Sequence, residues 1–274
     1  MSTSLAATRI DGHTTTEGGI YVRGDYYSAG RYDRGNQNFV VAANLGIEGH
    51  KLEQFRDRTG KLRVAGAELQ DCSCAGGLDI SWLRSASTAY HISPNIADYV
   101  LTEVPCVAVD YPNRNLDGFP HRELLKWRTA MSAMAYQTFR GKPTHIDHQN
   151  QDPTKAKGVI FDAMLLPVMG KLHVVLLKGF DRSKDAKLAK QVQMRERVGH
   201  SMGALVEKTR CSLPWCRFES NGHKTCEHIA NGQGKGRIVQ GHLVYEEMED
   251  FYFIESSSVL DPASITALSG HVYG

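Results

Sequence analysis

From residue 99 onward, the spacing of hydrophobic and polar positions is typical of strands. Short apolar runs bounded by turn residues cover residues 99–104, 106–109, 158–165 and 172–178. Such runs predict buried strands, with a break at Pro105. The last two flank Met169-Gly170, which predicts a β-hairpin. Further strands are expected at residues 142–148, 201–209, 238–244 and 251–259.

Helical spacing of apolar positions occurs in fewer segments. In residues 123–139, the apolar side chains recur every three or four positions, which predicts an amphipathic helix. A second helix is expected at residues 183–197 and a short one at residues 264–268. The pattern as a whole predicts a β-rich α+β domain with two main helices and without internal repeats.

Residues 1–97 have a different composition, in which glycine and other turn residues separate short apolar segments. Weak strands are predicted at residues 19–24, 38–43 and 62–65. We therefore place a boundary at residue 98 and expect a β-rich or extended segment before it. Its role is unknown, and a pro-segment and a docking module are both open.

Composition narrows the class of protein. The chain has 274 residues, 41% of them hydrophobic and 23% charged, which is typical of a soluble globular protein. Its formal net charge of +2 gives no electrostatic argument for binding nucleic acid or a membrane surface. No apolar run is long enough for a membrane span, and the first residues lack a signal-peptide pattern. The expected location is the cytoplasm, with reduced cysteines.

A candidate nucleophile lies in Gly199-His200-Ser201-Met202-Gly203. Serine becomes a nucleophile when a neighbouring imidazole takes its proton. Flanking glycines allow a sharp turn and bring backbone N–H groups, here those near Met202 and Gly203, close to a developing oxyanion. Taken alone, the pattern is more often an ordinary turn.

Three cysteines form a second chemical signal. Cys211, Cys216 and Cys226 lie close in sequence, and His228 follows the last of them. Three thiolates and one imidazole are the ligands of a closed structural zinc site. His223 is an alternative fourth ligand, and a loop of reduced cysteines without metal is the alternative to the whole site. A catalytic zinc is not expected, because no His-Glu-x-x-His pattern occurs.

Several motifs in order resemble a known family. They are Asp117-Gly118-Phe119-Pro120, Gly141-Lys142-Pro143 leading to His148-Gln149-Asn150, residues 152–159, Ser201-Met202-Gly203, Cys226-Glu227-His228-Ile229 and residues 253–263. Together, over residues 98–265, they resemble the tailed-phage prohead (head maturation) serine proteases, which are distantly related to the herpesvirus assemblins. Residues 1–97 resemble nothing that we can place.

The resemblance implies a barrel-like protease domain over residues 98–274, with two main flanking helices and a cysteine-rich insert at 211–228. It also implies a catalytic set of Ser201 as nucleophile, His148 as base and Glu255 as the acid that orients the imidazole. His145 is the nearest rival base. His200 adjoins Ser201 in sequence but is expected to face away from it, because side chains alternate along a strand. Two acids, Glu249 and Asp250, and a second histidine remain alternatives to Glu255.

Two positions depart from the pattern of the family. Ala204 stands where a cysteine commonly follows Ser-Met-Gly, and four residues separate Cys211 from Cys216 where two are usual. The alanine at position 204 changes only the volume of the side chain and should be tolerated. The second puts the metal geometry in question more than the peptidase chemistry.

The implied function is a serine endopeptidase without a catalytic cofactor. It would cleave capsid and scaffold precursor proteins inside the prohead or virion, in the host cytoplasm, as a monomer or homo-oligomer. One alternative is a non-catalytic virion structural protein that retains the protease fold. Another is a zinc-loop nucleic-acid enzyme of the His-Asn-His kind, which the near-neutral charge disfavours.

Overall fold

A computed structural model describes residues 12–14, 20–23, 80, 82–196, 198–220, 225–230 and 233–273. Strands dominate these residues and helices are short, so the predicted β-rich α+β class is confirmed. The predicted strands at residues 38–43 and 62–65 lie outside the described residues. In the part of the chain that the model covers, no helix is long and apolar enough to span a membrane.

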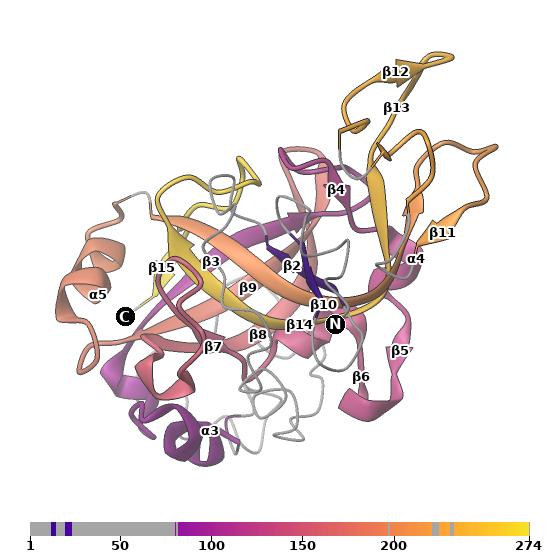
Figure 1. Cartoon of the computed structure of the whole chain (residues 1–274). Coiled ribbons are helices and arrows are strands. Elements are labelled where there is room, and N and C mark those ends of the chain that lie inside the picture. Colours follow the sequence, from indigo (N-terminus) through magenta and orange to yellow (C-terminus); the bar gives the residue numbers. More distant parts are fainter. Residues whose placement is uncertain are drawn as a thin grey trace.

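Two mainly antiparallel sheets make up most of the structure (Figure 1). The first has the order β1 (Gly12–Thr14), β2 (Ile20–Arg23), β10 (Gly199–Cys211), β14 (Glu246–Val259) and β4 (Asp117–Gly118), with β11 (Glu219–Ser220) also on β10. The second has the order β15 (Val272–Tyr273), β3 (Tyr99–Ala108), β9 (Lys171–Asp181), β8 (Gly158–Val168) and β7 (Pro143–Thr144). Both sheets are open, so the described residues form no closed barrel.

The main core lies between these sheets. It combines aliphatic side chains of β3, β8 and β9 with a cluster of aromatic side chains on the β14 side. Phe139 and Phe253 stack with ring centroids 3.9 Å apart, and Phe119 meets Phe251 edge-on at 5.1 Å. Burial of these rings fixes the long β10–β14 pair against the second sheet.

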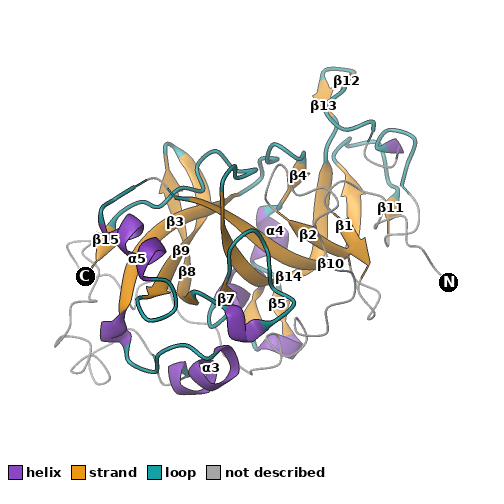
Figure 2. Cartoon of the chain, turned by 60° about the vertical axis from the view of Figure 1, so that its left-hand side comes forward, coloured by secondary structure: helices purple, strands orange, loops and turns teal. Residues whose placement is uncertain are grey.

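A helix that the spacing analysis did not predict precedes residue 98. Helix α3 (Leu83–Tyr90) lies against the second sheet (Figure 2), and Trp82 contacts Phe161 with ring centroids 5.7 Å apart. Its buried residues Leu83, Ala86 and Tyr90 have helical spacing, which was the available signal. Strand β2 likewise pairs with β10. The described parts of residues 1–97 therefore pack against the predicted domain.

The predicted helix at residues 123–139 is wrong. The segment forms α4 (His121–Leu124), the β5 (Trp127–Arg128) and β6 (Ala133–Met134) hairpin, and two 3₁₀ turns, η5 (Thr129–Met131) and η6 (Ala135–Phe139). Lys126 and Arg128 both pair with Asp250 of β14. Residues two apart do not share a helix face, so these ion pairs favour the extended conformation.

The remaining elements follow the predictions more closely. The second predicted helix is confirmed as α5 (Ala186–Gln193), whereas residues 264–268 form a turn. Strand β3 continues through Pro105, where a bulge at Cys106 absorbs the missing donor. The segment at 238–244 is a small hairpin of β12 (Ile238–Val239) and β13 (His242–Leu243). Two short 3₁₀ turns complete the list, η4 (Ile96–Asp98) and η7 (Pro153–Lys155).

Candidate functional site

The structure brings Ser201, His148 and Glu255 together. The Nε2 atom of His148 lies 2.7 Å from Oγ of Ser201, and its Nδ1 atom is hydrogen-bonded to Oε1 of Glu255. Ser201 comes from β10, Glu255 from β14 and His148 from the turn after β7. This is the connectivity of a nucleophile, a base and an orienting carboxylate.

Strand register aims the serine and the carboxylate at the same side. Ser201 pairs with Ser257 and Gly203 with Glu255, so their side chains share one face of the β10–β14 pair. The register shifts after Gly203, because Ala204 pairs with Phe253 and leaves Ile254 as an extra residue. This bulge puts Phe253 on the core face and Glu255, two residues later, on the opposite face with Ser201.

The histidine is presented by a tight turn that is anchored to β14. Asp147 donates its N–H to the Ser258 carbonyl at 2.9 Å, and Ser258 donates to the His145 carbonyl at 2.8 Å. Asp147 and His148 both have positive φ, at 47° and 54°. Two successive non-glycine residues in the left-handed region are strained, and such strain is typical of functional sites.

The carboxylate of Glu255 is ionised despite its complete burial. Burial alone would raise its pKa, but the charge and hydrogen bond of His148 and the Ser257 hydroxyl together hold the pKa below its usual range. The Ser257 Oγ atom donates to Oε2 at 2.6 Å. Both carboxylate oxygens therefore have a partner, which fixes the plane of the group.

The rival residues are placed elsewhere. Within the described residues neither ring nitrogen of His145 has a hydrogen-bond partner, and burial lowers its pKa to about 4. His200 faces away from the Ser201 side chain and contacts Lys178 and Ser269.

The alternative acids are also engaged at a distance from the histidine. Glu249 pairs with Arg122 and Arg210, and Asp250 with Lys126 and Arg128. Of the three acids considered, Glu255 is the one whose carboxylate the structure brings to His148.

Backbone N–H groups near the nucleophile were predicted to hold an oxyanion. His200 donates its N–H to the Ala267 carbonyl at 2.7 Å, on the side of β10 away from β14. Because N–H directions alternate along a strand, the Met202 N–H points to that same side. It therefore lies outside the β10–β14 hydrogen-bond ladder, as an oxyanion donor requires.

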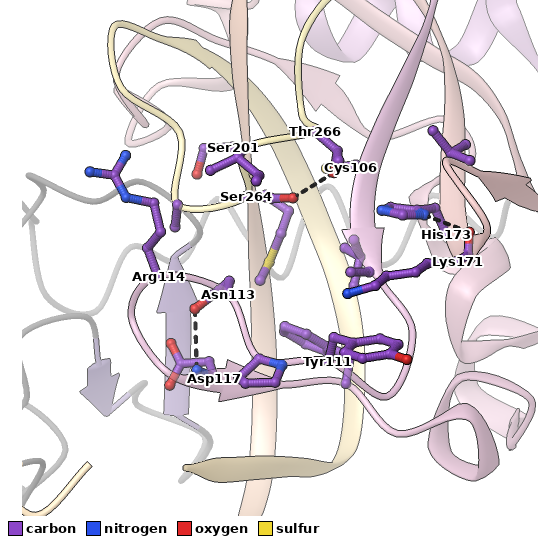
Figure 3. Close-up of a pocket in the computed structure, with 18 of the residues that line it drawn as sticks. Cys106, Tyr111, Asn113, Arg114, Asp117, Lys171, His173, Ser201, Ser264 and Thr266 are labelled. Carbon is purple, nitrogen blue, oxygen red and sulfur yellow. Dashed lines mark hydrogen bonds between the residues drawn. The ribbon is translucent and has the colours of Figure 1, made fainter. Parts of the chain in front are cut away.

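A cavity of about 370 Å³ borders the nucleophile strand (Figure 3). Ser201 lies at its edge, and Cys106, Met202 and Phe119 give it an apolar wall. The charged side chains at its rim already interact with other residues of the protein. Arg114 pairs with Asp261 at 2.6 Å, and Lys171 Nζ lies 3.8 Å from the Tyr111 ring centroid. The cavity is a candidate for holding an apolar group next to Ser201.

The predicted metal ligands also lie together. One ligand atom from each of Cys211, Cys216, Cys226 and His228 lies within 4.8 Å of the others. The donor set suits zinc, and the buried Nδ1 atom of His228 has no hydrogen-bond partner within the described residues. Burial raises the pKa of Cys211 to about 12 and also raises that of Cys226, so an ion must displace their protons. The alternative ligand His223 lies outside the described residues.

The cysteine cluster marks the far end of the strand that carries the nucleophile. Cys211 is the last residue of β10 and pairs with Glu246 at the start of β14. The insert, which contains β11, and the β12–β13 hairpin that follows it in sequence both project beyond this end, at the upper right of Figure 1. A metal here would tie the insert to the β10–β14 pair.

Residue-by-residue reasoning missed several groups that support the candidate triad. Ser257 follows Glu255 within a run of three serines, which is an unusual composition for a buried strand and was a usable signal. Lys178 ends an apolar run and is completely buried behind β10. A lysine at the end of a strand usually marks the surface, so the pattern alone did not reveal it.

Comparisons with protein-family models, with curated proteins and with solved structures find no match to this chain.

Proposed function

We propose that this protein is a serine hydrolase that acts by acyl transfer. The observation that carries the proposal is the continuous hydrogen-bonded series from Ser201 Oγ through both nitrogens of His148 to Glu255. An ionised carboxylate at Nδ1 fixes the tautomer in which Nε2 can accept the serine proton. Geometry of this kind is the requirement that a candidate base must meet first.

The reaction follows from these contacts. Ser201 Oγ attacks the substrate carbonyl carbon while His148 Nε2 takes its proton. The Oγ–carbon bond forms, and the tetrahedral oxyanion is held by backbone N–H groups, with that of Met202 as the candidate. His148 returns the proton to the leaving group as its bond to carbon breaks. Water, activated by His148, then hydrolyses the ester. Glu255 stabilises the imidazolium in both steps.

The substrate class comes from the resemblance to prohead proteases. On that ground we propose an endopeptidase whose substrates are capsid and scaffold precursor proteins during phage head maturation. Residues 141–150 and 201–203, which carry part of the resemblance, contain His148 and Ser201 of the candidate triad, whereas residues 117–120 adjoin the other end of β14. The apolar cavity beside Ser201 supports a peptide substrate with a hydrophobic side chain near the scissile bond.

We assign Cys211, Cys216, Cys226 and His228 to a structural zinc site. Four protein ligands close the coordination sphere and leave no position for a substrate. The cluster lies ten residues from Ser201 along the extended β10, at about 3.3 Å per residue, so it is remote from the reacting atoms.

The test uses a fluorophosphonate probe, which forms a covalent bond with activated serines. We expect labelling of the purified full-length chain at Ser201, mapped by peptide mass spectrometry, and cleavage of a co-expressed capsid precursor. Ser201→Ala should abolish both, while Ser212→Ala, a matched change beyond the far end of β10, should abolish neither. Cleavage that persists in Ser201→Ala would contradict the proposal.

One observation favours the alternative, a virion structural protein that does not cleave. Ser201 and His148 are each only 2% exposed and Glu255 is fully buried, so the candidate triad presents little surface to a substrate in this conformation. If the probe labels no serine and the precursor stays intact under conditions where the protein is folded, the structural role is the better proposal.

A further inference from the structure

A buried lysine lies directly behind the candidate nucleophile. Lys178 of β9 is completely buried, and its Nζ atom lies 3.0 Å from the Ser256 carbonyl, 3.1 Å from Ser256 Oγ and 3.0 Å from His200 Nδ1. An ammonium group has three N–H donors. Each donor therefore has one acceptor, which is what a cation needs to be tolerated in a core.

The partners of this lysine lead to the backbone of Ser201. Ser256 Oγ accepts from Lys178 and donates its own hydrogen to the Ser201 carbonyl at 2.8 Å. His200, the residue before Ser201, accepts from Lys178 at Nδ1 and donates from Nε2 to Ser269 Oγ at 2.8 Å. Two contacts of one ammonium thus hold the nucleophile on either side of its own Cα.

Lys178 and the triad lie on opposite faces of the same two strands. His200 and Ser256 belong to the face that packs on the second sheet, whereas Ser201 and Glu255 belong to the other face. Lys178 reaches the first sheet from the second, since it is on β9. It therefore links the two sheets at the position of the nucleophile.

The same distances could be taken for a serine–lysine pair with Ser256 as a second nucleophile. Two observations argue against this. The Ser256 hydrogen is already donated to the Ser201 carbonyl, and neither Ser256 nor Lys178 lines the cavity beside Ser201. Lys178 acts through other residues and does not touch the reacting atoms.

We propose that Lys178 is a positioning residue, which holds Ser201 in line with His148 through Ser256 and His200. This inference rests on the proposed role of Ser201 as a nucleophile. The titratable groups that influence the charge of Lys178 are the Cys106 thiol on β3, Glu255 on the opposite face of β14, and neutral His200 on β10. Burial lowers the pKa of Lys178 to about 7, partly offset by Cys106 and Glu255, so its charge changes near neutral pH.

The experiment measures the second-order rate of fluorophosphonate labelling of Ser201 between pH 6 and 9. We compare wild type with Lys178→Met, Ser256→Ala and the double variant. Each single change should slow labelling about tenfold, and the double should be no slower than the slower single, because both act on one connection. Loss of the cation should also move the acid midpoint of labelling to higher pH, since protonation of His148 becomes easier.

Leu176→Ala is the matched control. Leu176 is fully buried two positions earlier on β9, on the same face as Lys178, and belongs to the main core. It should lower the melting temperature through a cavity while the labelling rate at 25 °C and its pH midpoint stay within about twofold of wild type.

The outcomes separate the two proposals. If wild type is labelled at Ser201 but Lys178→Met and Ser256→Ala react at the wild-type rate with an unchanged midpoint, only the role of Lys178 is overturned. If Lys178→Met does not fold, Ser256→Ala alone decides, since it keeps the lysine and removes the bridge. If wild type is not labelled, the proposed function fails and this inference with it.

Discussion

The two ends of the β10–β14 pair carry two different kinds of polar site. At one end, Ser201, His148 and Glu255 are hydrogen-bonded to one another within the protein. At the other end, Cys211 and Cys226 have raised pKa values because of burial, and the Nδ1 atom of His228 has no partner within the described residues. The polar groups of the first site are satisfied by one another, whereas the second is a set of side chains that could hold a metal ion.

The contrast shows how one pair of strands serves both purposes. Antiparallel pairing fixes which side chains share a face. The register of β10 and β14 is therefore enough to bring the side chains of each site to the same side of the pair. At the serine end, a third segment adds the histidine, and Ser257 donates the second hydrogen bond to the carboxylate. At the cysteine end, the ligands come from the strand and the insert. We expect the first end to govern reactivity and the second to govern stability.

The largest expected effect comes from a substitution at the serine end of the β10–β14 pair. Glu255→Gln keeps the shape of the side chain but leaves His148 with a neutral partner, which favours the wrong tautomer. We expect the rate of probe labelling at Ser201 to fall by about 10⁴-fold. Glu249→Gln, a matched change among ion pairs of β14, should change the rate by less than about threefold. Equal effects of the two variants would contradict the assignment of Glu255.

The second prediction concerns the loss of a metal ion from the cysteine end of the pair. One zinc per chain should be found by elemental analysis, and Cys226→Ala or a chelator should remove it. Because metal binding is coupled to folding, we expect the melting temperature to fall by roughly 10 °C or more. Labelling of Ser201 at 25 °C should change by less than about threefold. A loss of labelling comparable to that of Glu255→Gln would show that the two ends do not act independently.

A smaller effect tests the hydrogen bonds of the candidate triad at the serine end. Ser257→Ala removes the hydroxyl that donates to Glu255 Oε2 at 2.6 Å, so the carboxylate loses a fixed partner. We expect labelling to slow about tenfold, the value of one hydrogen bond to a charged group. The neighbouring Ser258→Ala is the control, because Ser258 Oγ has no partner within the described residues and should be dispensable. The reverse order of effects would refute the role of Ser257.

The smallest effect concerns pH. Burial lowers the pKa of both Lys142 and Lys178 to about 7, against 10.5 for the unfolded chain. Unfolding then takes up protons, so the lysines cost most stability below pH 7 and less as pH rises. Between pH 7.5 and 8.5, each should raise the free energy of unfolding by up to about 1.4 kcal/mol. Urea denaturation should show this rise, and Lys178→Met should remove about half of it. A flat profile would mean that both lysines stay protonated in the folded protein over this range, as they are in the unfolded chain.

Much of this site could be anticipated from the order of motifs in the sequence. The resemblance to prohead proteases implied roles for Ser201, His148 and Glu255, and alternation along a strand already directed His200 away from the nucleophile. The cysteine cluster was equally visible, since its ligands are close in sequence.

Other features could not be predicted, and for physical reasons. The helix expected at 123–139 failed because Lys126 and Arg128 pair with Asp250, a partner more than a hundred residues away. The bulge at Ile254 depends on pairing register, which no single strand encodes. Lys178 is buried only because Ser256 and His200 from the other sheet solvate it.

The left-handed turn at Asp147 and His148 has a consequence for how proteins with this fold would diverge in sequence. Each of these backbone conformations costs of the order of 1 kcal/mol or more, and the fold itself gains nothing from that strain. Under the proposed function, this strain is useful because it aims the imidazole at Ser201. In a lineage that kept the fold as a building block, glycine or asparagine would relax the turn at lower cost. In a protein that kept this fold without the proposed reaction, residues 147 and 148 are therefore where we expect the turn to relax first.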